Sequence, residues 1–199
     1  MHISEGVLRP EILLAGAAVS TVLVGWAFKT LRHEEIPKTA VLCALFFIAS
    51  FIHVPVGPAS MHLVLGGIVG AFLGMRVFVA VFVGLLLQGL LFGYGGVSTL
   101  GVNVFNIATP ALLGYGLFEA SKKREKFKSL WWFLVGFVPL SVSASLLSLA
   151  LALNGEAFVG VAKVIFAAHF PLMVVEGVIT LFALAFVQKV SPRLLERAS

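Results

Sequence analysis

Apolar stretches long enough to cross a lipid bilayer constrain the fold of this chain more than any other feature. A helix needs about 18–20 apolar residues to cross a hydrocarbon core of about 30 Å. Seven spans are predicted, over residues 10–28, 39–54, 60–75, 77–95, 103–120, 130–153 and 168–188. Of the 199 residues, 60% are hydrophobic and 12% are charged, and a water-soluble domain cannot bury so much apolar surface. We therefore expect an all-α integral membrane protein of seven transmembrane helices, with residues 1–199 forming a single domain.

The basic residues lie in every second connection between these spans, and this alternation predicts the orientation of the chain. They are Lys29, Arg32, Lys38, then Arg76, then Lys122, Lys123, Arg124, Lys126, Lys128, and finally Lys189, Arg193 and Arg197. The other connections, residues 55–59, 96–102 and 154–157, contain no lysine or arginine. Because lysine and arginine are enriched on the cytoplasmic side of a membrane, we expect the N-terminus outside and the C-terminus in the cytoplasm.

The charge pattern also excludes several classes of function. The net charge of +5 comes from these connections and does not indicate a nucleic-acid partner.

Lys163 does not fit the alternation, so we expect it on a short outer amphipathic segment over residues 156–167, or paired inside the bundle. The chain has no GxxxxGK[ST] phosphate-binding loop, so any energy for its function must come from partners or from gradients.

The second residue is a histidine, and this position allows a particular kind of metal site. The terminal amine of Met1, the amide nitrogen of His2 and the His2 imidazole can form adjacent small chelate rings around one ion. Such near-planar nitrogen sites suit Ni(II) and Cu(II), and a further imidazole would supply a fourth nitrogen. Met1 is expected to remain, because methionine is normally removed only before small residues. The alternative is that His2 is an ordinary exposed terminal residue.

Other polar side chains on the predicted outer side are candidates for the same site. His62 lies at the outer start of the third span, where an unpaired ionisable residue is costly, and residues 3–9 are long enough to let His2 reach it. His53 is either a ligand or a residue that supports the ligands. Asn103 and Asn106 share one helical face and could bind a ligand or the folded N-terminus. The alternatives are a structural role for His62 and helix–helix hydrogen bonds for the asparagines.

Small residues recur at four-residue spacing in two of the predicted spans. Ala40 and Ala44 form one pair, and Gly66, Gly70 and Gly74 form a stripe. Such stripes allow helices to approach closely. The pattern does not say whether the partner helix belongs to the same chain or to another subunit.

Several motifs together resemble one known family. They are the N-terminal run Met1–Gly6, the segment Pro55–Leu63, the segments Leu90–Gly96 and Leu100–Asn106, and His169-Phe170-Pro171 followed by Glu176-Gly177. In these segments, and over nearly its whole length, the chain is similar to the metal-binding S subunits (NikM/CbiM family) of prokaryotic group I energy-coupling-factor transporters for nickel and cobalt.

This resemblance implies a fold, a set of ligands and partners. The fold would be the six-helix bundle of S subunits with one extra N-terminal helix, in the plasma membrane of a prokaryotic cell. The metal, carried as substrate, would be held by Met1, His2 and His62. Ala40 and Ala44 would contact the transmembrane coupling (T) subunit, which works with ATPase (A) subunits and in some systems an additional small membrane subunit. The cobalt branch tends to have Pro-Gly-Gly-Thr-Ser where this chain has Val56–Ser60, so Ni(II) is expected as the substrate, with Co(II) second.

The same residues are also compatible with a carrier of a different kind, whereas an enzyme is disfavoured. A stand-alone proton-coupled carrier of divalent cations would use Lys163, His169 and Glu176, and uptake by this chain alone in liposomes would distinguish it. An intramembrane metal-dependent hydrolase is disfavoured, because the chain has no HExxH motif and no aspartate. We therefore do not expect an enzyme.

Overall fold

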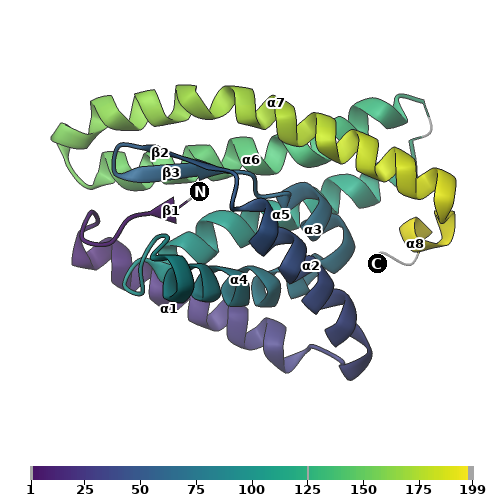
Figure 1. Ribbon diagram of the computed structural model, residues 1–199, viewed down its shortest axis with the longest axis horizontal. Coiled ribbons are helices and arrows are strands. Elements are labelled where there is room, and N and C mark those ends of the chain that lie inside the picture. The colour runs from purple at the N-terminus through teal and green to yellow at the C-terminus, as the bar shows by residue number, and fades with distance from the viewer. Residues whose placement is uncertain (1, 125, 197–199) are drawn as a thin grey trace.

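The computed structural model describes residues 2–124 and 126–196. Its elements in chain order are β1 (His2–Ile3), α1 (Pro10–Lys29), η1 (His33–Glu35), α2 (Ile36–Ala49), β2 (His53–Val56), β3 (Ala59–His62), α3 (Gly66–Leu73), η2 (Gly74–Arg76), α4 (Val77–Phe92), α5 (Leu100–Lys122), α6 (Lys128–Leu153), η3 (Glu156–Phe158), α7 (Val159–Val190) and α8 (Pro192–Glu196). Helices make up most of the molecule, and a small sheet lies at the end opposite α8 (Figure 1).

Five helical runs of the described residues are long and apolar enough to cross a membrane. They are α1, the run Gly66–Phe92, α5, α6 and the run Glu156–Val190. The run Gly66–Phe92 is interrupted at Gly74, whose φ of 50° and ψ of −129° are not helical. With 14 residues, α2 is shorter than the about 18 residues that a span needs. The structure therefore describes a helical membrane protein, while the number of seven crossings stays a prediction.

Residues 53–62 form a β-hairpin, where the sequence predicted the end of one helix and the start of the next. β2 and β3 pair antiparallel, and β1 adds to the other edge of β3, so the strand order is β1-β3-β2. The expectation of an all-α fold is therefore wrong here, and the predicted spans 39–54 and 60–75 are too long. The turn residue Gly57 has a φ of 57°, and Pro55 and Pro58 lack the amide hydrogen that a helix requires.

The last long helix begins earlier than the sequence indicated. Residues 156–167 were expected to form a separate amphipathic segment, but they form η3 and the start of α7, a helix of 32 residues. Lys163 lies exposed on this helix, so it does not pair inside the bundle. The separate segment was predicted because of the charge of Lys163, but the residues around it are mostly apolar and continue the helix.

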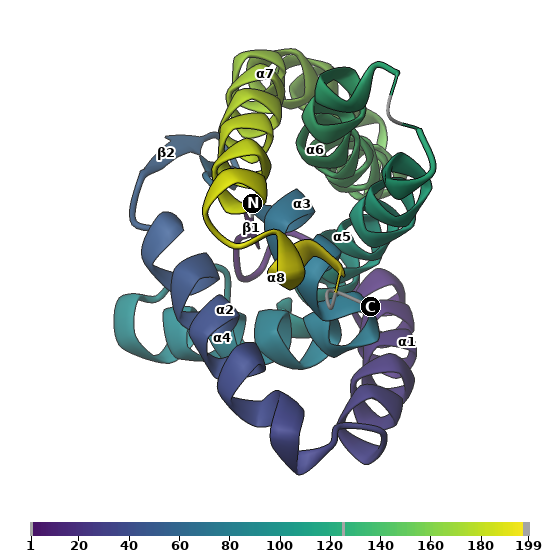
Figure 2. The ribbon, with the colours of Figure 1, turned by 90° about the vertical axis from the view of Figure 1, so that its right-hand side faces the viewer.

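The centre of the molecule is α3, which is surrounded by α2, α4, α5, α6 and α7 (Figure 2). The glycine stripe of this helix faces α5 of the same chain, where Gly66 and Gly70 meet Ala111 and Gly74 meets Tyr115. The stripe therefore serves packing within the bundle. A Cβ atom on Gly70 would overlap the backbone carbonyl of Ala111, so only glycine fits there.

We predict that Gly70→Ala destabilises the protein by about 1–3 kcal/mol, because α3 and α5 must separate to admit the methyl group. Gly116→Ala on α5 is the control, since nothing lies within 4 Å of a Cβ at that position. Thermal unfolding in detergent checks the pair. Equal unfolding midpoints for the two variants would show that α3 does not pack as described.

Candidate metal-binding site

The three-stranded sheet brings histidines that are far apart in the sequence to the same side. In its register, His2 lies opposite Ser60 and His53 lies opposite His62. Side chains two residues apart on a strand point to the same face, so His62 shares the face of Ser60. The strand register alone therefore places His2, His53 and His62 on one face.

His2 and His62 are in direct contact. Their ring centroids are 4.5 Å apart with an interplanar angle of 25°, and each side chain is only 2% exposed. The Nε2 atom of each ring is buried and has no hydrogen-bond partner among the described residues. Buried polar atoms normally have partners, so this pair is a candidate for binding a ligand.

The tautomer of His62 follows from its contact with the backbone. Its Nδ1 lies 2.9 Å from the carbonyl oxygen of Leu63, and a carbonyl oxygen can only accept a hydrogen bond. Nδ1 therefore carries the proton, and the lone pair of Nε2 is left available. Histidines that bind metals commonly have this arrangement, in which a backbone carbonyl orients the ring.

Burial also keeps the two imidazoles uncharged. Burial lowers the pKa of His2 to about 4; nearby His53 lowers it further, and the Gln88 amide raises it. Burial likewise lowers the pKa of His62 to about 4, although the contact with Leu63 acts in the opposite direction. Both residues lie outside the five candidate spans. Near neutral pH they are therefore neutral, which is the form that binds a metal ion.

The side chain of Asn103 on α5 holds strand β1 in place. Its Oδ1 accepts a hydrogen bond from the backbone nitrogen of Ile3 at 2.9 Å, and its Nδ2 donates to the Ile3 carbonyl at 3.2 Å. Nδ2 also donates to Thr99 Oγ1 at 3.2 Å. The Asn103 amide thus pairs with both backbone groups of Ile3, as a neighbouring strand would, and holds β1 beside the imidazole pair.

A second asparagine, which the sequence argument did not select, anchors the chain before α1. Asn154 Oδ1 accepts from the backbone nitrogen of Arg9 at 2.7 Å, and Nδ2 donates to the Val7 carbonyl at 2.6 Å. Between the two asparagines, the backbone nitrogens of Ser4 and Glu5 donate to Pro58 and Gly95, each at 3.1 Å. The N-terminal segment is therefore bound to several parts of the chain at once.

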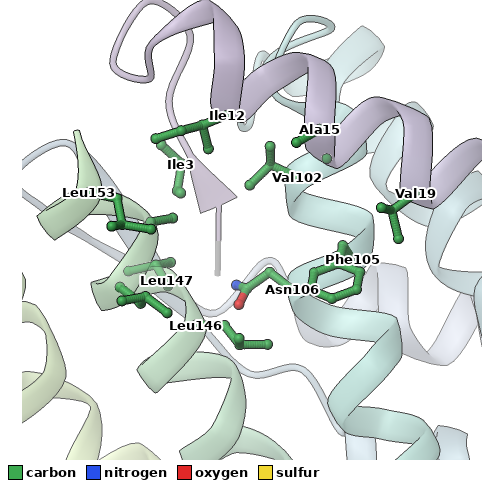
Figure 3. A pocket seen from close by; sticks show the side chains of 13 residues that line it. Ile3, Ile12, Ala15, Val19, Val102, Phe105, Asn106, Leu146, Leu147 and Leu153 are labelled. Carbon is green, nitrogen blue, oxygen red and sulfur yellow. The ribbon is translucent and has the colours of Figure 1, made fainter.

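The other predicted residues lie at different distances from the imidazole pair. The ring of His53 lies 4.4 Å from that of Tyr94, and Tyr94 lies 6.4 Å from His2, so His53 is at the edge of the site. Asn106 is 2% exposed, and neither of its amide atoms has a partner among the described residues. It points into an otherwise apolar cavity of about 230 Å³ between α1, α5 and α6 (Figure 3). Met1 lies outside the described residues.

Gln88 is a site neighbour that the sequence argument missed. It is fully buried on α4 and influences the pKa of His2, yet its amide forms no hydrogen bond of good geometry among the described residues. The signal in the sequence was a lone polar residue within the apolar run 77–92. Polar residues in such runs are costly and often functional.

The described side chains alone do not complete a metal site. Within residues 2–124 and 126–196, no three histidine, cysteine, aspartate or glutamate side chains are close enough to bind one ion. An ion between His2 and His62 would therefore need further ligands from the backbone, from the terminal amine or from water.

This fold defines the class of the protein, a helical membrane protein with the architecture of a transition-metal transporter. A crystal structure of a transition metal transporter matches it with a TM-score of 0.81 at 26% identity, over 96% of this chain and 93% of that one. The chain belongs to the CbiM family, described as the cobalt uptake substrate-specific transmembrane region, whose model matches residues 2–194.

Two relatives show how the family is named elsewhere. A protein of Haemophilus influenzae named as a metal transport protein is 35% identical over 99% of this chain and 98% of its own length. A protein of Archaeoglobus fulgidus named as a fused nickel transport protein, NikMN, is 26% identical over 99% of this chain and 68% of its own length.

We predict that Asn103→Ala releases β1, because the removal of the amide leaves both polar groups of Ile3 unpaired at a cost of about 1–3 kcal/mol. Hydrogen–deuterium exchange of residues 3–5 should speed up. Asn106→Ala, one turn away and equally buried, removes no hydrogen bond among the described residues and should have a smaller effect. If the two variants exchange alike, Asn103 does not hold the strand.

Proposed function

We propose that this protein is the substrate-capture subunit for uptake of Ni(II), with Co(II) as the second choice, by an ATP-driven energy-coupling-factor transporter. The observation that carries the proposal is the contact between His2 and His62, two buried imidazoles whose Nε2 atoms have no partner among the described residues. Burying the two Nε2 atoms without hydrogen-bond partners costs stability. The burial of His2 on strand β1 is therefore better explained by a ligand that these atoms bind.

The proposed ligands are the terminal amine of Met1, the amide nitrogen and imidazole of His2, and the imidazole of His62. Two imidazoles that bind one ion at right angles, with metal–nitrogen distances of about 2 Å, have ring centres roughly 4.5 Å apart. The observed separation is 4.5 Å. The rings lie nearly face to face, so at least one must rotate about its Cβ–Cγ bond when an ion enters, and His2 is the candidate because Leu63 restrains His62.

The proposed preference for nickel rests on the donor atoms. Four nitrogens close to a plane, including a deprotonated amide, suit Ni(II) and Cu(II) better than ions that prefer tetrahedral or oxygen-rich sites. The segment Val56–Ser60, which differs from the pattern of the cobalt branch, forms the turn of the hairpin that carries His62, together with the last residue of β2 and the first two of β3. His53, Asn103 and Asn106 would support the ligands without binding the ion.

The proposed orientation agrees with the distribution of charge in the fold. Arg76 donates to Glu35 at 3.1 Å and to the Thr30 carbonyl at 3.1 Å, which joins two of the basic connections, and Lys128 donates to Gln188 at 3.0 Å. These connections lie at the end of the molecule that contains α8, whereas the sheet lies toward the opposite end (Figure 1). With the basic end in the cytoplasm, the imidazole pair would be near the outer face.

We predict that adding one residue before Met1, or the change His62→Ala, weakens Ni(II) binding by more than about 100-fold, because each removes a ligand and even supporting residues contribute 10–100-fold. His33→Ala is the matched control, since this histidine is exposed in η1. Isothermal titration of Ni(II) into each of the three variants, compared with the parent protein that keeps its native N-terminus, checks the prediction. Unchanged nickel stoichiometry in the extended protein would reject the ligand set.

The ATP-driven partners need a contact surface, and α2 provides a candidate. Ala40 and Ala44 are exposed on α2, in contrast to the glycine stripe of α3, and Val41 and Ile48 beside them are 68% and 61% exposed. An exposed small-residue face with apolar neighbours suits close packing against another membrane helix. We propose that it contacts the T subunit, with lipid covering the remaining apolar faces.

We predict that the double change Ala40→Leu and Ala44→Leu prevents co-purification with the T and A subunits while Ni(II) binding stays normal, because leucine keeps the partner helix at a distance. Ala18→Leu, on the exposed side of α1, should leave both properties intact. Recovery of the full complex with the double variant would place the contact elsewhere.

A further inference from the structure

Glu176, in the middle of α7, holds the backbone where strand β3 turns into α3. Its side chain is 1% exposed. Its Oε1 accepts hydrogen bonds from the backbone nitrogens of Val64 at 2.5 Å and Leu65 at 2.7 Å. A buried carboxyl group far along one helix thus supports the start of another helix, 111 residues away in sequence.

The turn that Glu176 supports has an unfavourable backbone conformation. Leu65 has a φ of 53° and a ψ of 30°, in the left-handed region, where a residue with a side chain as large as leucine is uncommon. No side chain from the turn itself caps the first turn of α3. Strained conformations persist when the surrounding structure holds them, and they cluster at functional sites. Here the external cap from Glu176 is the contact that holds the turn.

This turn is connected directly to the imidazole of His62. The ring is oriented by the carbonyl oxygen of Leu63, and that carbonyl belongs to the same peptide group as the Val64 nitrogen held by Glu176. On its other side, the Leu63 nitrogen donates to the Ile52 carbonyl at 3.3 Å. The peptide that fixes the tautomer of His62 is therefore held from α7.

Glu176 itself has little freedom to move. A Cβ atom on Gly136 of α6 would overlap the backbone carbonyl of Glu176, and one on Gly177 would overlap the ring of Phe133. The two helices therefore touch along their backbones at this level. Because close-packed backbones cannot shift without separating the helices, the backbone at Glu176 has a fixed position relative to α6.

We infer that Glu176 is a positioning residue for the metal site, which fixes the direction of the His62 imidazole through the peptide between Leu63 and Val64. This role rests on the proposed function of His62 as a ligand. The requirement is an acceptor oxygen at the position of Oε1, which accepts both backbone hydrogen bonds, and a negative charge is not required.

The test compares three changes at this position. Glu176→Gln retains an acceptor oxygen at the same reach, and Ni(II) affinity should stay within a few-fold of the parent. Glu176→Leu removes the acceptor, and affinity should fall about 10–100-fold, the usual effect of losing a residue that orients a ligand. Leu184→Ala, a cavity change on the same helix at a fully buried leucine, controls for lost stability: it should lower the unfolding midpoint and leave nickel affinity and absorption spectrum unchanged.

Glu176→Asp keeps the test decisive if the leucine variant does not fold. Aspartate retains the charge but is one methylene too short to reach both amides, so affinity should follow the order parent, Gln, Asp. The reverse order of Gln and Asp, or unchanged affinity in the leucine variant, would overturn the inference.

A metal-free measurement separates this inference from the proposed function. In ¹⁵N spectra of the parent protein, His62 should show the tautomer protonated at Nδ1, and Glu176→Asp should shift it toward a mixture, while Glu176→Gln should not. A parent protein that shows this pattern and binds no Ni(II) would reject the proposed function alone. An identical His62 spectrum in the parent and the aspartate variant would reject the role of Glu176 alone.

Discussion

The backbone of the buried residues His2 and Ile3 has to form its hydrogen bonds inside the molecule, and the rest of the site depends on this constraint. A buried peptide group without a partner costs several kcal/mol in an apolar environment. The chain meets the requirement with the central strand of the sheet, β3, and with the side chain of Asn103, while Asn154 binds the backbone of Val7 and Arg9 further along the segment. His2 reaches His62 only because this set of partners exists.

The helices supply the rigidity that a short sheet cannot provide alone. A strand of two residues has almost no stability of its own, and β1 is fixed by its pairing with β3 and by Asn103 on α5. Asn154 at the end of α6 fixes the segment that follows. Those helices are fixed in turn by glycine contacts, such as Gly70 against Ala111. The close helix packing and the position of the imidazoles are therefore parts of one arrangement.

Much of this could be predicted from the sequence, and the failures have physical reasons. The long apolar runs and the histidines at positions 2 and 62 are local features, so they could be found without a structure. The hairpin over residues 53–62 was missed because its residues are mostly apolar. Since they lie next to long apolar runs, they were assigned to the neighbouring helices. Glu176 stood out in the sequence as part of a motif and as a candidate for proton coupling, but its partners, the amides of Val64 and Leu65, could not be found. Backbone groups carry no sequence signal, and α7 meets them only in the folded chain.

The hydrogen bonds of the N-terminal segment also set an order of events during synthesis. Ile3 binds a residue 100 positions later, and Arg9 binds one 145 positions later. At a translation rate of about 5–20 residues per second, the N-terminal segment waits roughly 7–30 s before its last partner, Asn154, has been made. The beginning of the chain is thus among the last parts to dock, and until then two histidines that end up shielded from water remain accessible to any ion or chaperone nearby.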